Sequence, residues 1–388
     1  MEYDTMAEIN DGIEVKIIAF YLPQYHTIPL NDYYWGEGFT EWTNVKKAVP
    51  LFKGHNQPRI PLNQNYYNLL DDDVKIWQAN LAKEYGIFGF CYYHYWFQDG
   101  QRLLEKPAEQ MLANMKIDQP FCFCWANENW SKNWDGGNHE IIMEQKYGTQ
   151  KEWEEHFTYL LPFFQDKRYI TVDGRPLFII YKPEQIIDIA SMISYMRKRA
   201  KEEGFPGICF AFQFPSYYAD MFYQEGLFDY RIEFEPVYSR NMQAMEKPGT
   251  APKVRMMRRI LGEKAVAAYR KRNVEKARGW SKSENLSMYF YDEMWEKILN
   301  AEWKEDFLPG GFVDWDNTPR NKHGLMFSGY SVEKFEEYMK RLVERAYREK
   351  KPMLFLNAWN EWGEGAYLEP DETDGYKKLE AIKNAFMK

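Results

Sequence analysis

Two glutamates three residues apart carry the strongest chemical signal in the sequence. Glu361 and Glu364 lie in the stretch 354–369, where an apolar run with buried-strand character gives way to amides, carboxylates and indoles. Glycoside hydrolysis usually needs two carboxyl groups, one to protonate the leaving oxygen and one to support the anomeric centre or act as a base. When two glutamates three residues apart have no further context, one of them more often caps a helix or pairs with an arginine. The Trp-Asn-Glu-Trp-Gly-Glu-Gly context favours a catalytic pair instead.

Other polar and aromatic residues follow further predicted strands. Acidic groups at these ends suit hydrogen bonds to sugar hydroxyls, and the alternative is a salt bridge to Arg231 or Arg320. The indoles suit stacking on sugar rings, and the alternative is packing within the long loops. The predicted substrate-binding set comprises Tyr21, Gln24, Trp35, Glu41, Trp42, His94, Trp96, Trp125, Asn127, Glu128, Trp130, Glu235, Asp314, Asp316, Arg320, Asn360 and Trp362.

The sequence does not predict a metal or a cofactor. His26 and His94 each follow a predicted strand, but a lone histidine in an aromatic cluster is more often a structural donor than a catalyst. No pair of histidines or cysteines has zinc-like spacing. No glycine-rich turn of the phosphate-binding type follows a strand. We therefore expect chemistry carried by side chains alone.

The positions of these groups are set by strands and helices that alternate along the chain. Such alternation predicts a parallel sheet, and eight repeats predict a closed (β/α)8 TIM barrel with long loops at the carboxyl ends of the strands. We expect one domain over 1–388, with a helical insertion or cap at 238–306 after the sixth strand. The predicted strands are 15–22, 87–96, 121–126, 177–181, 208–214, 230–234, 311–315 and 353–356. The predicted helices are 71–85, 101–115, 151–164, 189–203, 332–350 and 374–386.

Composition limits the classes of partner. The net charge is −8, which argues against nucleic-acid binding, and no apolar run is long enough to cross a membrane. No signal peptide is recognisable, so we expect a cytoplasmic protein. The four cysteines lie in apolar runs and are expected to be buried, reduced thiols. Residues 253–282 hold eleven Lys or Arg against two Glu. This segment is either a solvated helix face or a contact surface for an anionic glycan, a phosphate-linked lipid or a membrane.

Six stretches, in the same order along the chain as in a known family, carry a resemblance to that family. The chain resembles the WbsX-like proteins of bacterial polysaccharide gene clusters, which are often labelled glycosyltransferases or lipopolysaccharide biosynthesis proteins. These are similar in turn to glycoside hydrolase family 99, the endo-α-mannosidases. The stretches are Phe-Tyr-Leu-Pro-Gln-Tyr-His at 20–26, Trp-Gly-Glu-Gly-Phe-Thr-Glu-Trp-Thr-Asn at 35–44, Gly-Phe-Cys-Tyr-Tyr-His-Tyr-Trp at 89–96, Trp-Ala-Asn-Glu-Asn-Trp at 125–130, Asp-Asn-Thr-Pro-Arg at 316–320 and Trp-Asn-Glu-Trp-Gly-Glu-Gly at 359–365.

The resemblance implies a (β/α)8 barrel that acts on mannose-type glycans without a metal. Carried over, Glu361 would be the base that activates the sugar 2-hydroxyl, giving a 1,2-anhydro intermediate, and Glu364 would be the acid and base at the glycosidic oxygen. The expectation is a retaining glycoside hydrolase. One alternative is a glycosyltransferase of lipopolysaccharide, O-antigen or capsule biosynthesis, although no two-Rossmann layout is visible. Another is a non-catalytic glycan-binding protein.

Overall fold

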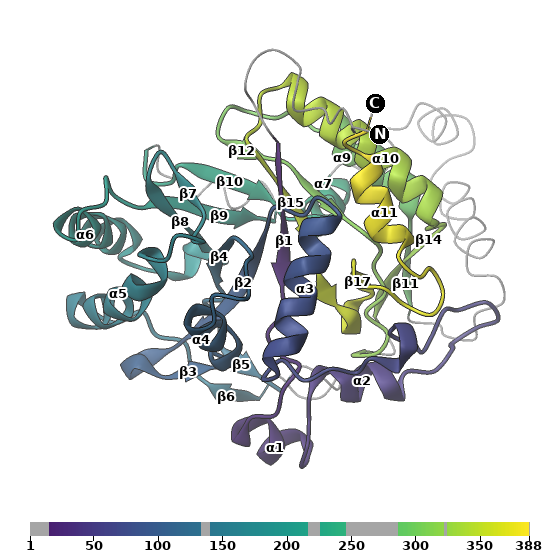
Figure 1. Cartoon of the computed structure of the whole chain (residues 1–388), viewed down its shortest axis with the longest axis horizontal. Coiled ribbons are helices and arrows are strands. Elements are labelled where there is room, and N and C mark those ends of the chain that lie inside the picture. Colours follow the sequence, from purple (N-terminus) through teal and green to yellow (C-terminus); the bar gives the residue numbers. More distant parts are fainter. Residues whose placement is uncertain (1–14, 133–139, 216–225, 246–285, 322–323, 388) are drawn as a thin grey trace.

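A nearly closed barrel of parallel strands forms the centre of the molecule (Figure 1). The computed structural model describes residues 15–132, 140–215, 226–245, 286–321 and 324–387. Neighbouring strands pair in the order β12-β10-β9-β8-β4-β2-β1-β15-β13. Their bounds are β1 (Lys16–Tyr21), β2 (Gly89–Trp96), β4 (Phe121–Trp125), β8 (Arg175–Ile180), β9 (Cys209–Phe214), β10 (Tyr230–Glu233), β12 (Phe307–Leu308), β13 (Gly310–Phe312) and β15 (Met353–Asn357).

The barrel is completed by one interrupted strand. β12 pairs with β10 and β13 pairs with β15, and only Pro309 separates β12 from β13. Proline has no N–H to donate, so it breaks a ladder at this point. Counted this way, the barrel has the eight strands that the sequence predicts. The seventh strand lies earlier than the predicted 311–315 because Pro309 marks its centre and not its beginning.

Gly310 allows the interrupted strand to approach β10. A Cβ placed on Gly310 would lie 1.8 Å from the backbone oxygen of Glu233, far inside van der Waals contact. The backbones can therefore meet here only without a side chain between them. On the other side, the N–H of Phe355 donates to the oxygen of Pro309 at 3.0 Å.

Helices surround the barrel and bury apolar stripes against it (Figure 1). The amphipathic helix predicted at 332–350 is α10, whose Phe335, Met339 and Leu342 are fully buried. The described helices are α1 (Pro29–Trp35), α2 (Glu41–Lys47), α3 (Asp72–Glu84), α4 (Lys106–Ala113), α5 (Gln150–Phe164), α6 (Ile189–Glu202), α7 (Val237–Met245), α9 (Tyr291–Asn300), α10 (Val332–Arg348) and α11 (Lys377–Asn384). None of these is long and apolar enough to cross a membrane.

One predicted helix is shorter than expected. We predicted a helix at 101–115, but α4 begins only at Lys106. Pro107 is tolerated in a first turn and not in a helix interior, so the helix cannot extend a turn upstream. The residues before it instead form β3 (Arg102–Leu103), which pairs antiparallel with the end of β2.

Long connections gather at the carboxyl ends of the strands. In Figure 1 the arrow of β1 points toward the part of the molecule where α1, α2, β5 (Trp130–Ser131) and β6 (Ile141–Met143) lie. In the predicted insertion at 238–306, the described residues form α7, β11 (Ser287–Phe290) and α9. β11 pairs with β14 (Leu325–Ser328) outside the barrel. The basic segment 253–282 lies outside the described residues.

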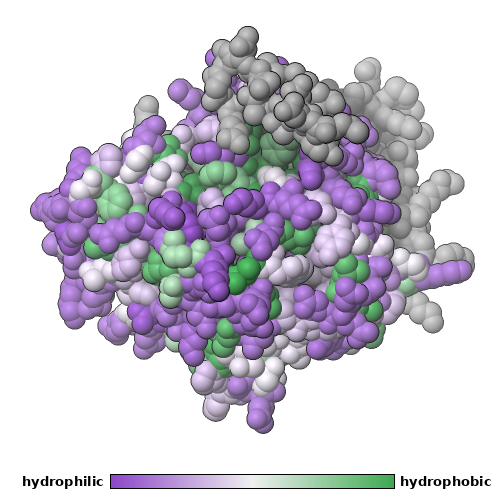
Figure 2. Space-filling view, viewed as in Figure 1, coloured by the Kyte–Doolittle hydropathy of each residue, from purple (hydrophilic) through white to green (hydrophobic). Residues whose placement is uncertain are grey.

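Both faces of the barrel strands are buried. Every residue of β4, β9 and β15 is buried, as parallel strands covered by helices require. The four cysteines are buried and free, as predicted. The face shown in Figure 2 is mostly hydrophilic, with apolar residues in small separate patches. The apolar content is therefore used mainly in the core, and polar groups that are buried at the strand ends need specific partners.

Candidate active site

Three carboxylates surround one guanidinium at the carboxyl end of the barrel. Arg320 donates from Nε to Glu41 at 2.8 Å, from Nη1 to Glu364 at 2.6 Å and from Nη2 to Glu361 at 2.9 Å. Glu361 and Glu364 follow β15, Glu41 begins α2, and Arg320 lies beyond β13. We call these four residues the Arg320 cluster. The structure thus brings together both predicted catalytic residues and two predicted binding residues from three separate loops.

Gly363 makes this close assembly possible. A Cβ on Gly363 would lie 1.9 Å from Oε1 of Glu41 and 2.8 Å from Nε of Arg320. The backbone of the loop between the two glutamates therefore fills the space beside the ion pair. Any other residue at this position would push Glu41 or Arg320 away.

The Arg320 cluster has more negative than positive groups. The side chain of Glu41 is fully buried, and those of Glu361 and Glu364 are 9% and 23% exposed. Burial raises the pKa of Glu361 to about 8, although Arg320 opposes the shift. Burial also raises the pKa of Glu41. One guanidinium faces three carboxylates, and the raised pKa of Glu361 means that this carboxyl holds a proton near neutral pH.

Hydrogen bonds between side chains and the backbone fix the loop that carries the two glutamates. Asn360 accepts from the N–H of Leu22 at 2.7 Å and donates to the oxygen of Leu22 at 3.0 Å. The Tyr25 hydroxyl donates to the oxygen of Asn360 and accepts from the N–H of Trp362. The loop after the last barrel strand is therefore joined to the loop after the first. Asn360, a predicted binding residue, uses its amide for this purpose.

A second arginine supports the loop from the other side. Arg59 pairs with Asp314 at 2.8 Å, and Asp316 accepts from His55 and Gln57, each at 2.8 Å. We call these five residues the Arg59 cluster. Burial alone would raise the pKa of Asp316, but His55 and Arg59 outweigh burial and lower it to about 2. The predicted binding residues Asp314 and Asp316 are thus engaged with protein partners.

The Arg59 cluster is connected directly to the loop that carries Glu361 and Glu364. The backbone N–H of Asp316 donates to the backbone oxygen of Glu364 at 2.6 Å. Arg59 also approaches Gly365, the residue after Glu364, whose backbone has φ +67°. The Arg59 cluster therefore sets the position of Glu364 without contributing a group to the Arg320 cluster.

Three tyrosines that sequence reasoning missed are close enough to the carboxylates to interact with their charges. The charge of Glu361 contributes to raising the pKa of Tyr93 and Tyr95, after burial, and that of Glu364 contributes at Tyr181. The Tyr95 hydroxyl accepts from Gln24 at 3.1 Å, which places this predicted binding residue beside the cluster. Tyr93 and Tyr95 alternate with His94 in β2. The two-residue period of a strand therefore indicates that the two tyrosines share one face and His94 lies on the other.

Four predicted binding residues lie on the opposite side of the strands, facing the helices. His94 contacts His156 of α5 through their Nε2 atoms at 3.0 Å. Trp96 stacks on His156 and Trp125 packs edge-on against it. Tyr21 donates to Gln78 of α3 at 2.6 Å. The structure does not bring this group to the Arg320 cluster.

The remaining predicted residues divide between the site and its surroundings. Glu128 forms an ion pair with Lys182 and is partly exposed, and its charge acts on Tyr181. Asn127 instead bonds to the backbone of Lys182 in both directions. Glu235 caps α7 by accepting from Ser239, and burial raises its pKa to about 7.

The other predicted indoles are used mainly in packing. Trp130 is buried in a small apolar cluster with Tyr95 and Phe97, against which Trp35 packs. Trp42 donates to the oxygen of Tyr67 and packs beside Trp362, which donates to Glu369. Among the residues that the structure describes, no group of three or more His, Cys, Asp or Glu could hold a metal ion.

Clustered carboxylates at the carboxyl end of a parallel α/β barrel are an arrangement that enzymes acting on glycosidic bonds use. The chain belongs to the WbsX family: residues 17–382 match the family model described as "Glycosyltransferase WbsX". It is 32% and 33% identical to two proteins of Xanthomonas campestris pv. campestris, from strains B100 and ATCC 33913, both described as "Uncharacterized protein WxcX". These alignments cover 99% of this chain and 51% of each relative, so the chain spans about half the length of the curated relatives it matches.

Solved structures with the same fold include glycoside hydrolases. A "Glycoside hydrolase-like protein" aligns with a TM-score of 0.56 at 13% identity, covering 98% of this chain and 96% of its own. The GH99 endo-alpha-mannosidase from Bacteroides thetaiotaomicron aligns with a TM-score of 0.53 at 12% identity, covering 96% and 97%. At these identities the likeness concerns the fold, and it confirms the predicted barrel.

Proposed function

We propose that this protein is a retaining glycoside hydrolase that acts on a mannose-type glycan or a bacterial surface polysaccharide, with Glu361 and Glu364 as its catalytic carboxyl groups. The observation that carries the proposal is the sharing of one guanidinium by both glutamates and Glu41. Two carboxyl groups that are held by one buried cation suit acid and base catalysis at one glycosidic bond.

The proposed reaction has two steps. In the first, Glu361 removes the proton of the sugar 2-hydroxyl, O2 attacks C1, and the departing glycosidic oxygen takes a proton from Glu364. The product is a 1,2-anhydro sugar. In the second, Glu364 removes a proton from water, the water oxygen attacks C1, and O2 leaves with the proton held by Glu361. Each step inverts C1, so the starting configuration is retained.

Glu361 can act as the base only in its ionised form. Burial raises its pKa to about 8, so that form is a stronger base than a surface carboxylate, and the first step begins once Glu361 has lost the proton that it holds near neutral pH. Glu364 is the more exposed of the two, so a departing glycosidic oxygen can reach it more readily. Arg320 keeps the remaining negative charge of the cluster tolerable while the proton moves.

Product analysis tests the proposal. The protein is incubated with mannose-containing oligosaccharides and with bacterial surface polysaccharide, without a nucleotide-sugar, and products are followed by NMR. We expect a new reducing end that first appears in the starting anomeric configuration. Release in the opposite configuration would contradict the retaining mechanism.

A glycosyltransferase is the second candidate, because the description of the matching family names that activity. It predicts no cleavage in the same experiment, followed by sugar transfer when a nucleotide-sugar is added. A glycan-binding protein without activity would bind the oligosaccharides in both conditions and change none of them.

A further inference from the structure

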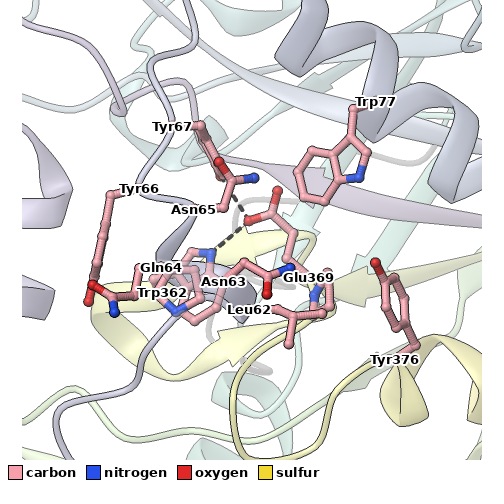
Figure 3. Close-up of a pocket in the computed structure, with 12 residues that line it drawn as sticks. Leu62, Asn63, Gln64, Asn65, Tyr66, Tyr67, Trp77, Trp362, Glu369 and Tyr376 are labelled. Atoms are coloured by element: carbon pink, nitrogen blue, oxygen red, sulfur yellow. Dashed lines mark hydrogen bonds between the residues drawn. The ribbon is translucent and has the colours of Figure 1, made fainter.

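A cavity of about 500 Å³ lies behind the catalytic loop, apart from the Arg320 cluster. Its walls come from the 3-10 turn η2 (Leu62–Gln64) and the residues after it, from α3, and from the segment 369–376 (Figure 3). The volume falls within the range of small-molecule sites. The lining residues are Pro61, Leu62, Asn63, Gln64, Asn65, Tyr66, Tyr67, Trp77, Trp362, Glu369, Pro370 and Tyr376.

Aromatic rings form much of the wall. Tyr66 and Trp77 are half-buried and Tyr376 is 39% exposed, so their rings are accessible to a ligand. Trp362 and Tyr67 close the inner end and are buried. Flat, accessible rings of this kind offer stacking surfaces for the apolar faces of a sugar ring.

Three consecutive side-chain amides complete the wall. Asn63, Gln64 and Asn65 are exposed. Within the described chain none of their side-chain amide groups has a hydrogen-bond partner, although the backbone N–H of Asn63 is bonded. Each amide offers both a donor and an acceptor. Alternating donors and acceptors beside aromatic rings match the hydroxyl groups of a saccharide.

The loop that presents the amides is held in a strained conformation. Asn63 and Gln64 have φ angles of 56° and 55°, in the left-handed region that residues other than glycine seldom adopt. The loop is fixed from outside, because the N–H of Asn63 donates to Glu372 at 2.7 Å and the N–H of Leu62 to Pro370 at 3.0 Å. Such strain is most common at binding and catalytic sites.

The charge of the wall favours an uncharged ligand. None of the described residues that line the cavity is a Lys, Arg or His. Among those residues the carboxyl group is that of Glu369, which accepts from Tyr67 at 2.8 Å, Trp362 at 2.6 Å and Gln78 at 2.7 Å (Figure 3 shows the first two). Burial raises the pKa of Glu369 to about 7. An anionic ligand would meet no cation here, and a cationic one would meet a carboxyl group that is already fully engaged.

We propose that this cavity is a binding site for an uncharged saccharide unit, separate from the catalytic carboxylates and in contact with the back of their loop. Trp362 forms the connection, because its indole lines the cavity while its backbone joins Glu361 to Gly363. Saccharide binding here requires no turnover. Only the further step, that the unit belongs to the same glycan that is cleaved, rests on the proposed function.

The test is an NMR titration of the 14 tryptophan indole signals in the full chain carrying Glu361→Gln, which prevents turnover. The probes are methyl α-mannoside, methyl β-glucoside and mannobiose. The Trp77 signal is assigned by its loss in Trp77→Phe. We expect a saturable shift of this signal with at least one probe. Gln64→Gly combined with Asn65→Ala should raise the Kd at least tenfold.

The variants separate binding from folding. Glycine adopts the left-handed conformation of Gln64 without strain, so Gln64→Gly should leave Tm unchanged or higher. Asn80→Ala, which removes an exposed amide on α3 outside the cavity, should leave the Kd unchanged. The proposal is overturned if no probe shifts the Trp77 signal, or if the double variant binds as tightly as its parent. Cleavage by the wild-type protein is measured separately, so failure of one proposal does not imply failure of the other.

Discussion

The two buried arginines at the barrel mouth differ in the number of carboxylates that surround them. Arg59 is 6% exposed and its partner Asp314 is 7% exposed, and the neighbouring Asp316 has hydrogen bonds to both of its oxygens. Arg320 is 16% exposed and faces three carboxylates, one of them 23% exposed. In the first group one arginine and one histidine lie beside two carboxylates, and the group is closed. In the second a single arginine lies beside three carboxylates, and the group is partly open.

This difference suggests that the Arg59 cluster holds the loops in place, whereas the Arg320 cluster carries the proposed chemistry. A balanced buried pair has nothing to gain from exchanging a proton, and losing one partner would leave an uncompensated charge. An overcharged group already holds a proton that it can give up or take back. Members of both groups were predicted as site residues, with Glu361 and Glu364 as the catalytic pair and Glu41, Arg320, Asp314 and Asp316 as binding residues. Their charge balance distinguishes them, and each prediction below tests that distinction.

The largest expected effect is on turnover when the Arg320 cluster loses a catalytic carboxyl group. Glu361→Gln and Glu364→Gln should each lower kcat by roughly 100- to 10,000-fold, which is the usual rate contribution of a general acid or base. Neither variant should lower Tm, because each removes one negative charge from a group with too many. Glu344→Gln, an exposed change on α10, is the control. Turnover like that of the wild type would remove that glutamate from the mechanism.

The next effect is on stability when the Arg59 cluster loses its cation. Arg59→Met leaves Asp314 buried without its ion pair and should lower the free energy of unfolding by about 3–5 kcal/mol. Arg341→Met removes an exposed pair with Glu296 and should cost at most about 1 kcal/mol. Denaturant titration measures both. Equal losses in the two variants would mean that the Arg59 cluster has no special supporting role.

The third effect is a pH dependence of stability that originates in Glu361. Its pKa rises from 4.5 to about 8 on folding, so its contribution to stability is complete below pH 4.5 and is lost as the pH rises through 8. We expect the wild type to lose stability relative to Glu361→Gln over this interval in denaturant titrations. A constant difference between the two proteins would show that Glu361 ionises normally in the folded state.

The smallest effect concerns the missed tyrosines. Tyr93→Phe removes a hydroxyl that lies in the field of Glu361 and accepts from Gln213, and kcat/KM should fall roughly tenfold, which is about 1.4 kcal/mol. Tyr92→Phe, one residue earlier and packed against Tyr21 outside the barrel, should leave kcat/KM within twofold. A larger loss from Tyr92→Phe than from Tyr93→Phe would reverse the assignment of the two faces.

Much of the fold could be predicted because alternating strands and helices leave a strong periodic pattern. Strand β15 and helix α10 fall where the sequence places them. The local context of Glu361 and Glu364 led to their prediction as a catalytic pair, and the structure places both beside Arg320. The errors came from proline, which shortened α4 and divided the seventh strand at Pro309, and both follow from its missing N–H.

Two features of the site were beyond sequence reasoning for physical reasons. Barrel strands are apolar on both faces, so the pattern of β2 did not reveal whether His94 or its neighbours Tyr93 and Tyr95 face inward. The meeting of Glu41 with Arg320 depends on how two long loops pack, which no local pattern encodes. Individual residue types at these positions were recognised as polar, but their mutual contacts were not predictable.

The pairing of β1 with β15 has a consequence for the order of events during synthesis. β1 lies near the beginning of the barrel sequence and β15 forms its last strand, with Lys16 opposite Met353. A ribosome must therefore deliver almost the whole barrel before β1 gains its second neighbour. The same late segment carries Glu361 and Glu364, so an unfinished barrel has neither a closed sheet nor the proposed catalytic pair. Closure of the sheet and assembly of the Arg320 cluster therefore both wait for the last strand and its loop.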